Sequence, residues 1–149
     1  MSAGGTLDLA DAAARLAAVT GGDALGLPVV ALGWATVDTE RAVAELREHG
    51  PFEAAGDESI LGARCALGRR DAAVRLAILE PNTEGRLAAT LARHAEGPAV
   101  LWVAGTPPYG LRLSTPADGP FGRERLVLGG TLGGHHLLVV ERPAGTIER

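Results

Sequence analysis

The sequence predicts an α+β fold in which short strands alternate with amphipathic helices. The clearest evidence is the stretch 74–103, where an apolar run, a helical pattern and a second apolar run follow one another. Pro81 ends the first run, because proline cannot donate to a strand ladder. Leu87, Leu91 and His94 then recur at helical spacing, before a Gly-Pro pair ends the helix. A second observation is internal duplication: a strand, helix, strand, strand, strand order is followed by a shorter copy.

The composition is that of a single globular domain. The chain has 149 residues, of which 46% are hydrophobic and 21% are charged, and this length can bury its own core. The formal net charge is −4 and the chain has no basic segment, so we expect neither nucleic acid nor a membrane as a partner. Aromatic residues make up only 3%, so Ala, Leu and Val must build the core.

The sequence also predicts a cytoplasmic protein. The single cysteine, Cys65, cannot form an internal disulfide or a CxxC motif, which fits a reducing compartment. Asp8 and Asp11 stand near the N-terminus without a basic segment, so this region does not resemble a secretory signal. No apolar run approaches the roughly 18 residues that span a bilayer.

The first half of the chain contains a helix followed by one complete unit of the duplication. Its expected elements are helix 6–22, strand 29–37, helix 40–49, a weak extended segment 52–55, and strands 60–67 and 74–79. Thr6 and Asp38 are the expected N-caps of the two helices. Gly56-Asp57 is expected to form a turn. The first helix either covers the core or forms an oligomer contact.

The second half repeats this order without its helix. Its expected elements are a linking helix within 82–97 that begins near Asn82 and Thr83, and strands 99–104, 111–114, 125–128 and 135–141. Thr106-Pro107-Pro108 stands where the first unit has its helix, and this segment cannot form one. The predicted organisation is one domain, with an N-terminal extension (1–25), a first module (29–81), a linking helix (82–97) and a second module (98–143).

Two internal alignments support the duplication. HHLLVVE at 135–141 aligns with VRLAILE at 74–80, and alignment of Ala99 with Ala31 places Trp102 on Trp34. These alignments predict that both tryptophans pack beneath helices.

Two segments resemble the vicinal oxygen chelate superfamily, which includes glyoxalase I, methylmalonyl-CoA epimerase, extradiol dioxygenases and bleomycin-resistance proteins. They are GWATVDTERAVAEL at 33–46 and LAILEPNTEGRLAATLARHAEG at 76–97. The resemblance implies paired βαβββ modules that form a cup-shaped mixed sheet, in a protein that is often a homodimer.

Catalytic members of that superfamily bind a divalent metal through His, Gln or Glu on the first and last strands of each module. In this sequence the corresponding positions are Ala31, Ala77, Ala99 or Val100, and Leu138. None of these side chains can bind a metal, so we expect no metal at the usual site and no cofactor. The alternative is a rebuilt site from His135, His136, Glu80 and Glu141. Adjacent strand residues face opposite sides, which disfavours this alternative.

The strand period of two places Arg75, Leu79 and His136 on the cup face with Ala77 and Leu138. Arg75 could hold a carboxylate, enolate or phosphate, and His136 could act as a general acid or base. Both could equally be structural.

Small residues at the other inward positions predict an open pocket in which a ligand binds. The expected ligand-binding residues are Ala31, Gly33, Ala77, Leu79, Leu138, Tyr109 and Arg112. Three functions stay open at this point. The first is a binding protein with an apolar, metal-free cup for a small organic molecule. The second is an isomerase or lyase, either metal-independent through His136 and Arg75 or metal-dependent at a rebuilt site. The third is a vestigial domain that supports only dimerisation.

Overall fold

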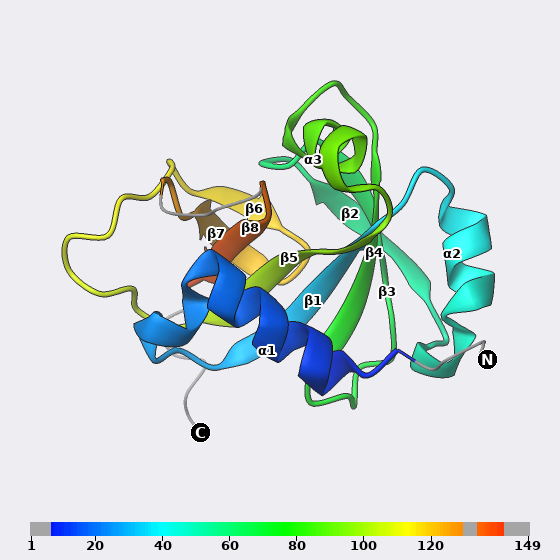
Figure 1. Ribbon diagram of the computed structural model, residues 1–149, viewed down its shortest axis with the longest axis horizontal. Coiled ribbons are helices and arrows are strands. Elements are labelled where there is room, and N and C mark those ends of the chain that lie inside the picture. The colour runs from blue at the N-terminus through cyan, green and yellow to red at the C-terminus, as the bar shows by residue number, and fades with distance from the viewer. Residues whose placement is uncertain (1–6, 130–133, 142–149) are drawn as a thin grey trace.

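The computed structural model describes residues 7–129 and 134–141, which form one curved sheet with helices on both faces (Figure 1). The strands are β1 (Val29–Ala35), β2 (Glu53–Glu58), β3 (Ala63–Leu67), β4 (Arg75–Pro81), β5 (Gly97–Ala104), β6 (Ala117–Gly119), β7 (Gly122–Leu126) and β8 (His136–Val140). The helices are α1 (Leu9–Thr20), α2 (Thr39–Glu45) and α3 (Arg86–His94), with 3-10 turns η1 (Gly22–Leu25) and η2 (Arg47–His49). The predicted α+β class is confirmed.

The sheet consists of two modules joined at its centre. The strand order is β2-β3-β4-β1-β5-β8-β7-β6. β1 pairs parallel with β4, β5 pairs parallel with β8, and β1 and β5 pair antiparallel between the modules. The sheet curves into a nearly closed cup, as predicted. Residues 105–116 are all described and contain no helix, so the second module is the reduced one.

The sheet registers show which residues are equivalent in the two modules. Gly33 pairs with Ala77 in the first module, and Trp102 pairs with Leu138 in the second. Because the predicted alignment of β4 with β8 places Leu138 on Ala77, Trp102 is the counterpart of Gly33. The predicted match of Trp102 with Trp34 is therefore wrong by one residue. A shift of one residue moves a strand side chain to the opposite face.

Each face of the sheet carries its own hydrophobic core. On the outer face, α1 and α2 pack over residues that include Leu32 and Leu101, and Trp34 packs there as predicted. The inner face encloses a second core that contains Trp102, and α3 covers this core with Leu87. The prediction that Trp102 lies beneath the outer helices is thus wrong, because it points into the cup.

Helix α1 covers the outer face of β1 and β5 (Figure 1). Its N-cap is Asp8, whose side chain accepts a hydrogen bond of 3.0 Å from the backbone N–H of Asp11. The N-cap predicted at Thr6 lies outside the described residues. Gly21 ends the helix with φ 82°, a conformation that favours glycine. Of the two roles predicted for this helix, the structure shows core cover.

Three other local predictions are wrong. Helix α3 begins after Gly85 without a side-chain cap, not at Asn82. The predicted turn at Gly56-Asp57 lies within β2, which β3 holds in an extended conformation. Residues 111–114 form only a single bridge between Leu113 and Val127, while β6 was not predicted. No helix among the described residues is long and apolar enough to cross a membrane.

Candidate functional site

The inward-facing positions that were expected to line an open cup are closed to solvent. Four of them are 0% exposed: Ala31, Ala77, Leu79 and Leu138. At Gly33, an added Cβ would lie 2.9 Å from both Trp102 and Val100. The larger side chains of β5 therefore fill the space that the small residues of β1 leave. The expected open interior is absent in this structure, and the ligand contacts of these residues stay a prediction.

The residues at the superfamily's metal positions do not fit a metal. The sheet registers select Val100 rather than Ala99 as the position on the first strand of the second module, because Val100 lies opposite His136 as Ala31 lies opposite Arg75. The side chains of Ala31, Ala77, Val100 and Leu138 carry no donor atom. In the chain segments 7–129 and 134–141, no group of three or more His, Cys, Asp or Glu could hold a metal ion.

The structure separates the four residues of the alternative metal site. Glu80 accepts hydrogen bonds from the backbone and hydroxyl of Thr39 and forms an ion pair of 2.7 Å with Arg64. These hydrogen bonds, that of Arg64 first, lower the pKa of Glu80. Glu141 pairs instead with Arg125 at 3.0 Å. His135 stacks on His94, with 4.7 Å between the ring centroids.

Arg75 and His136 are bonded to different parts of the fold. Strands β1 and β5 lie between their strands, β4 and β8. The Arg75 Nε donates to the Gly68 carbonyl at 2.8 Å, and its Nη2 lies 3.4 Å from Glu53. Arg75 therefore ties β4 to the β2–β3 edge. Joint action of Arg75 and His136 on one small ligand would require Arg75 to leave these partners, and it stays a prediction.

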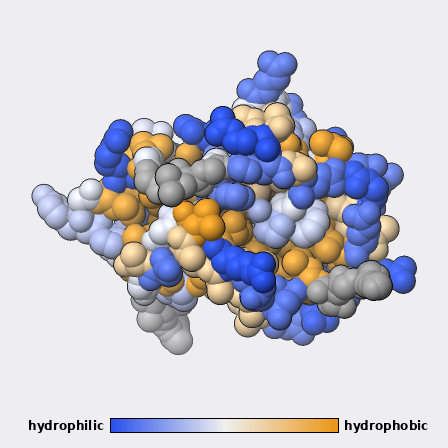
Figure 2. All heavy atoms as spheres, viewed as in Figure 1, coloured by the Kyte–Doolittle hydropathy of each residue, from blue (hydrophilic) through white to orange (hydrophobic). Residues whose placement is uncertain are grey.

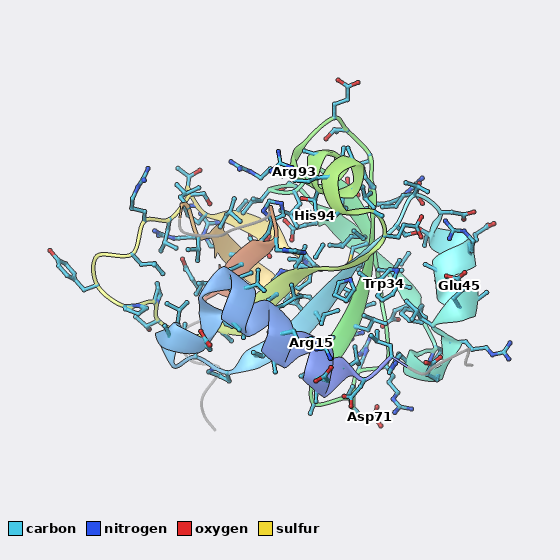
Figure 3. All side chains as sticks on the ribbon, in the orientation of Figure 1. Arg15, Trp34, Glu45, Asp71, Arg93 and His94 are labelled. Carbon is cyan, nitrogen blue, oxygen red and sulfur yellow. The ribbon has the colours of Figure 1, made fainter. Side chains whose placement is uncertain are left out.

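His136 lies at the bottom of a cleft between α3 and the start of β8. The cleft has a volume of about 200 Å³ and is lined by Arg86, Ala89, Thr90, Arg93, Gly134 and His136. Figure 3 shows Arg93 and His94 on the side of α3 that faces the start of β8. We call this site the α3–β8 cleft.

Hydrogen bonds fix the His136 ring. Its Nε2 lies 2.9 Å from Thr90 Oγ1, which also lies 2.9 Å from the Gly134 carbonyl and 3.0 Å from the Arg86 carbonyl. The hydroxyl has one proton for these carbonyls, so we infer that Nε2–H donates to Thr90 Oγ1. Burial and the nearby Arg86 cation lower the pKa of His136 to about 4, so the ring is neutral at pH 7.

Two arginines make the rim of the cleft positive. Arg86 and Arg93 are seven residues apart on α3, about 10 Å along the helix axis, and both are exposed. Within the described part of the chain neither has a carboxylate partner, whereas Arg41, Arg64 and Arg125 each do. In Figure 2, hydrophilic residues lie beside apolar ones at the surface over α3.

The sequence contains a pattern of polar residues that indicates this cleft, but the prediction did not use it. Arg86, Thr90 and Arg93 recur at helical spacing, and they form a polar stripe beside the apolar residues of α3. The structure places the other predicted contacts elsewhere. Tyr109 is fully exposed, and Arg112 lines a separate groove of about 450 Å³ beside η1. Ligand contacts by these two residues stay a prediction.

Sequence comparison finds no match to a protein-family model or to a curated protein. Solved structures do match. Methylmalonyl-CoA epimerase from Mycobacterium tuberculosis has a TM-score of 0.61 and 20% identity, over 78% of this chain and 88% of that chain. A variant of the Streptomyces coelicolor epimerase in complex with 2-nitronate-propionyl-CoA has a TM-score of 0.62 and 23% identity, over 80% and 100%.

The fold is that of the vicinal oxygen chelate proteins. A hypothetical protein from Bacillus halodurans C-125 shares it, with a TM-score of 0.58 and 15% identity over 83% of this chain and 99% of that chain. At these identities the likeness concerns the fold alone, and it agrees with the resemblance found in the sequence.

Proposed function

We propose that this protein binds a small organic anion in the α3–β8 cleft without a metal at the superfamily's usual positions. One observation carries the proposal: two arginines, neither of which has a carboxylate partner within residues 7–129 and 134–141, line a cleft together with a half-buried, neutral histidine. Arginine forks bind carboxylate and phosphate groups. A neutral imidazole adds a hydrogen-bonding group without a competing charge.

The ligand of the Streptomyces coelicolor structure supports this ligand class. That protein holds 2-nitronate-propionyl-CoA, which is an anionic thioester. For this chain we propose a carboxylate, nitronate-like or phosphate-bearing molecule. A cytoplasmic location and a homodimer are parts of the same proposal, and they rest on the sequence and on the superfamily resemblance.

Calorimetric titration of the purified chain tests the anion site. The probes are malonate, inorganic pyrophosphate and coenzyme A, each at low and high salt. We expect the R86Q/R93Q double variant to weaken the tightest of these interactions at least tenfold, because both charges at the rim are lost. The control is Arg47→Gln, which removes an exposed arginine that also lacks a carboxylate partner. Unchanged affinity in the double variant, or no saturable binding of any probe, would refute the proposal.

A second candidate function is metal-independent proton transfer, as in an isomerase or lyase. It is favoured by the tautomer of His136: because Nε2 carries the proton, Nδ1 is left with a lone pair that can accept one. Arg75 is bound to Gly68 and Glu53, whereas Arg86 lines the same cleft as His136, so Arg86 would hold the anionic group.

His136→Ala separates binding from catalysis. We measure deuterium uptake by methylmalonyl-CoA in D₂O and its binding affinity in the same preparations. A binding protein shows no uptake above the uncatalysed rate, and the substitution lowers its affinity. An enzyme loses uptake by at least 100-fold with affinity within threefold of the original.

A further inference from the structure

A pair of buried carboxyl groups closes the cup where its two edges meet. Glu58 ends β2, and Glu124 lies on β7 beside the other edge strand, β6. Both side chains are 0% exposed. β2 and β6 approach each other there without pairing as strands. Side chains, not a backbone ladder, therefore join the two edges.

The hydrogen bonds of this pair leave one oxygen of each carboxyl group without a donor. Trp102 Nε1–H donates to Glu124 Oε1 at 3.0 Å, and the Ile60 N–H donates to Glu58 Oε2 at 3.2 Å. Glu58 Oε1 and Glu124 Oε2 are buried and receive no donor from the described residues. The two carboxyl groups interact with each other, and this interaction raises the pKa of Glu124. Such an interaction is favourable only when one of them is protonated.

Among the described residues, no cation inside the cup compensates for a second negative charge. Cys65 on β3 interacts electrostatically with both carboxyl groups. It also interacts electrostatically with Arg75 on β4. The Arg75 guanidinium is already bound to the Gly68 carbonyl and to Glu53. The other charged residues of the surrounding strands are exposed to solvent or form ion pairs away from the two carboxyl groups: Asp57, Arg64, Asp118, Arg123 and Arg125.

We propose that Glu58 and Glu124 share a single proton and form a pH-dependent latch between β2 and β7. While the proton is present, the carboxyl groups hold the two edges together and the cup interior stays closed. When the proton dissociates, two carboxylates face each other in a water-poor interior, and their repulsion separates the edges. Trp102 and the apolar interior then become accessible.

Two further observations support the latch. Burial, and then Glu58 itself, raises the pKa of Glu124 to about 9, while burial raises the pKa of Glu58. Gly119 on β6 lies directly against the Glu124 carboxyl group, because an added Cβ there would clash with it. The edge strand β6 therefore packs on one member of the pair.

The test follows Trp102 fluorescence and amide hydrogen exchange from pH 6 to 10.5. A W34F background leaves Trp102 as the only tryptophan. We expect a red shift of emission with a midpoint near pH 9. After correction for base catalysis, exchange in β2 and β7 should rise at least tenfold. Burial raises the pKa of Cys65 to about 12, so the thiol does not titrate in this range.

Glu124→Gln and Glu58→Gln should each abolish the transition, because an amide donates to the remaining carboxylate without a shared proton. The matched control is Glu48→Gln at an exposed position, which should leave the transition unchanged. A transition of unchanged midpoint in the two latch variants would overturn the proposal. So would a W34F protein whose emission and exchange stay constant up to pH 10.5. If one variant fails to fold, the other decides.

Discussion

Trp102→Ala should lower the free energy of unfolding by about 3–5 kcal/mol, as expected for a large aromatic removed from a packed core. Trp102 is 0% exposed, it fills the space over Gly33, and it contacts Phe121 edge-on at a centroid distance of 5.1 Å. The substitution also removes the hydrogen bond to Glu124. Urea denaturation of the wild-type and variant proteins measures the difference.

The matched control is Trp34→Ala on the outer face. Trp34 is only half-buried beneath the helices, so we expect less than half of the Trp102 effect. The two variants should also differ in their response to indole. Indole should raise the melting temperature of the Trp102 variant alone, because only there does it find an enclosed cavity inside the cup. Equal destabilisation by the two substitutions would contradict the packed interior described above.

Glu124→Gln should stabilise the protein at pH 8 by about 1–3 kcal/mol, because an amide donates to Glu58 without the proton that the folded wild-type protein must take up at this pH. The pKa of Glu124 rises from 4.5 in the unfolded chain to about 9 in the folded protein. Between these values the folded state binds the proton more tightly, so unfolding releases it and the stability falls as pH rises. The slope has an upper limit of about 1.4 kcal/mol per pH unit for one proton.

Comparison of the two proteins between pH 7 and 9 isolates this effect. The lowered pKa values of Glu80, Glu96 and His136 affect stability only below about pH 6.5, and in the opposite direction. The raised pKa of Cys65 also lowers stability as the pH approaches 9, because the thiol ionises more readily in the unfolded chain, but it does so equally in both proteins. Urea denaturation at pH 7, 8 and 9 should therefore show a falling stability for the wild-type protein and a flatter profile for Glu124→Gln. Parallel profiles for the two proteins would mean that Glu124 is not the titrating group.

The fold was predictable because its central elements carry strong local signals. The Glu80-Pro81 step, the stripe of α3 and the apolar run of β5 each mark an element without reference to the rest of the chain. Strand β2 has no such signal. Its sequence EAAGDE lacks alternating apolar residues, and pairing with β3 makes it a strand.

The interior was less predictable, because its packing depends on a register that differs by a single residue. Aligning Trp102 with Trp34 placed an indole outside the cup, whereas the sheet register places it inside, over Gly33. The positions that were expected to line an open pocket therefore form a packed core. The carboxyl pair could not be predicted from the sequence either, because Glu58 and Glu124 are 66 positions apart and neither segment contains a known motif. Only the curvature of the sheet brings them together.

Helix α1 precedes the first module in the sequence but packs partly on the second module. This helix packs on β5, and its neighbour Gly22 lies close to Leu101 and Leu137 of the second module. Part of the outer surface that it covers is therefore made by residues that the ribosome adds after the whole first module. The apolar side of α1 can complete its packing only when β5 and β8 are present. A cut between α3 and β5 would divide the chain into two fragments. Helix α1, which covers the outer face of β5, would then lie on the first fragment, while β5 and β8 would lie on the second.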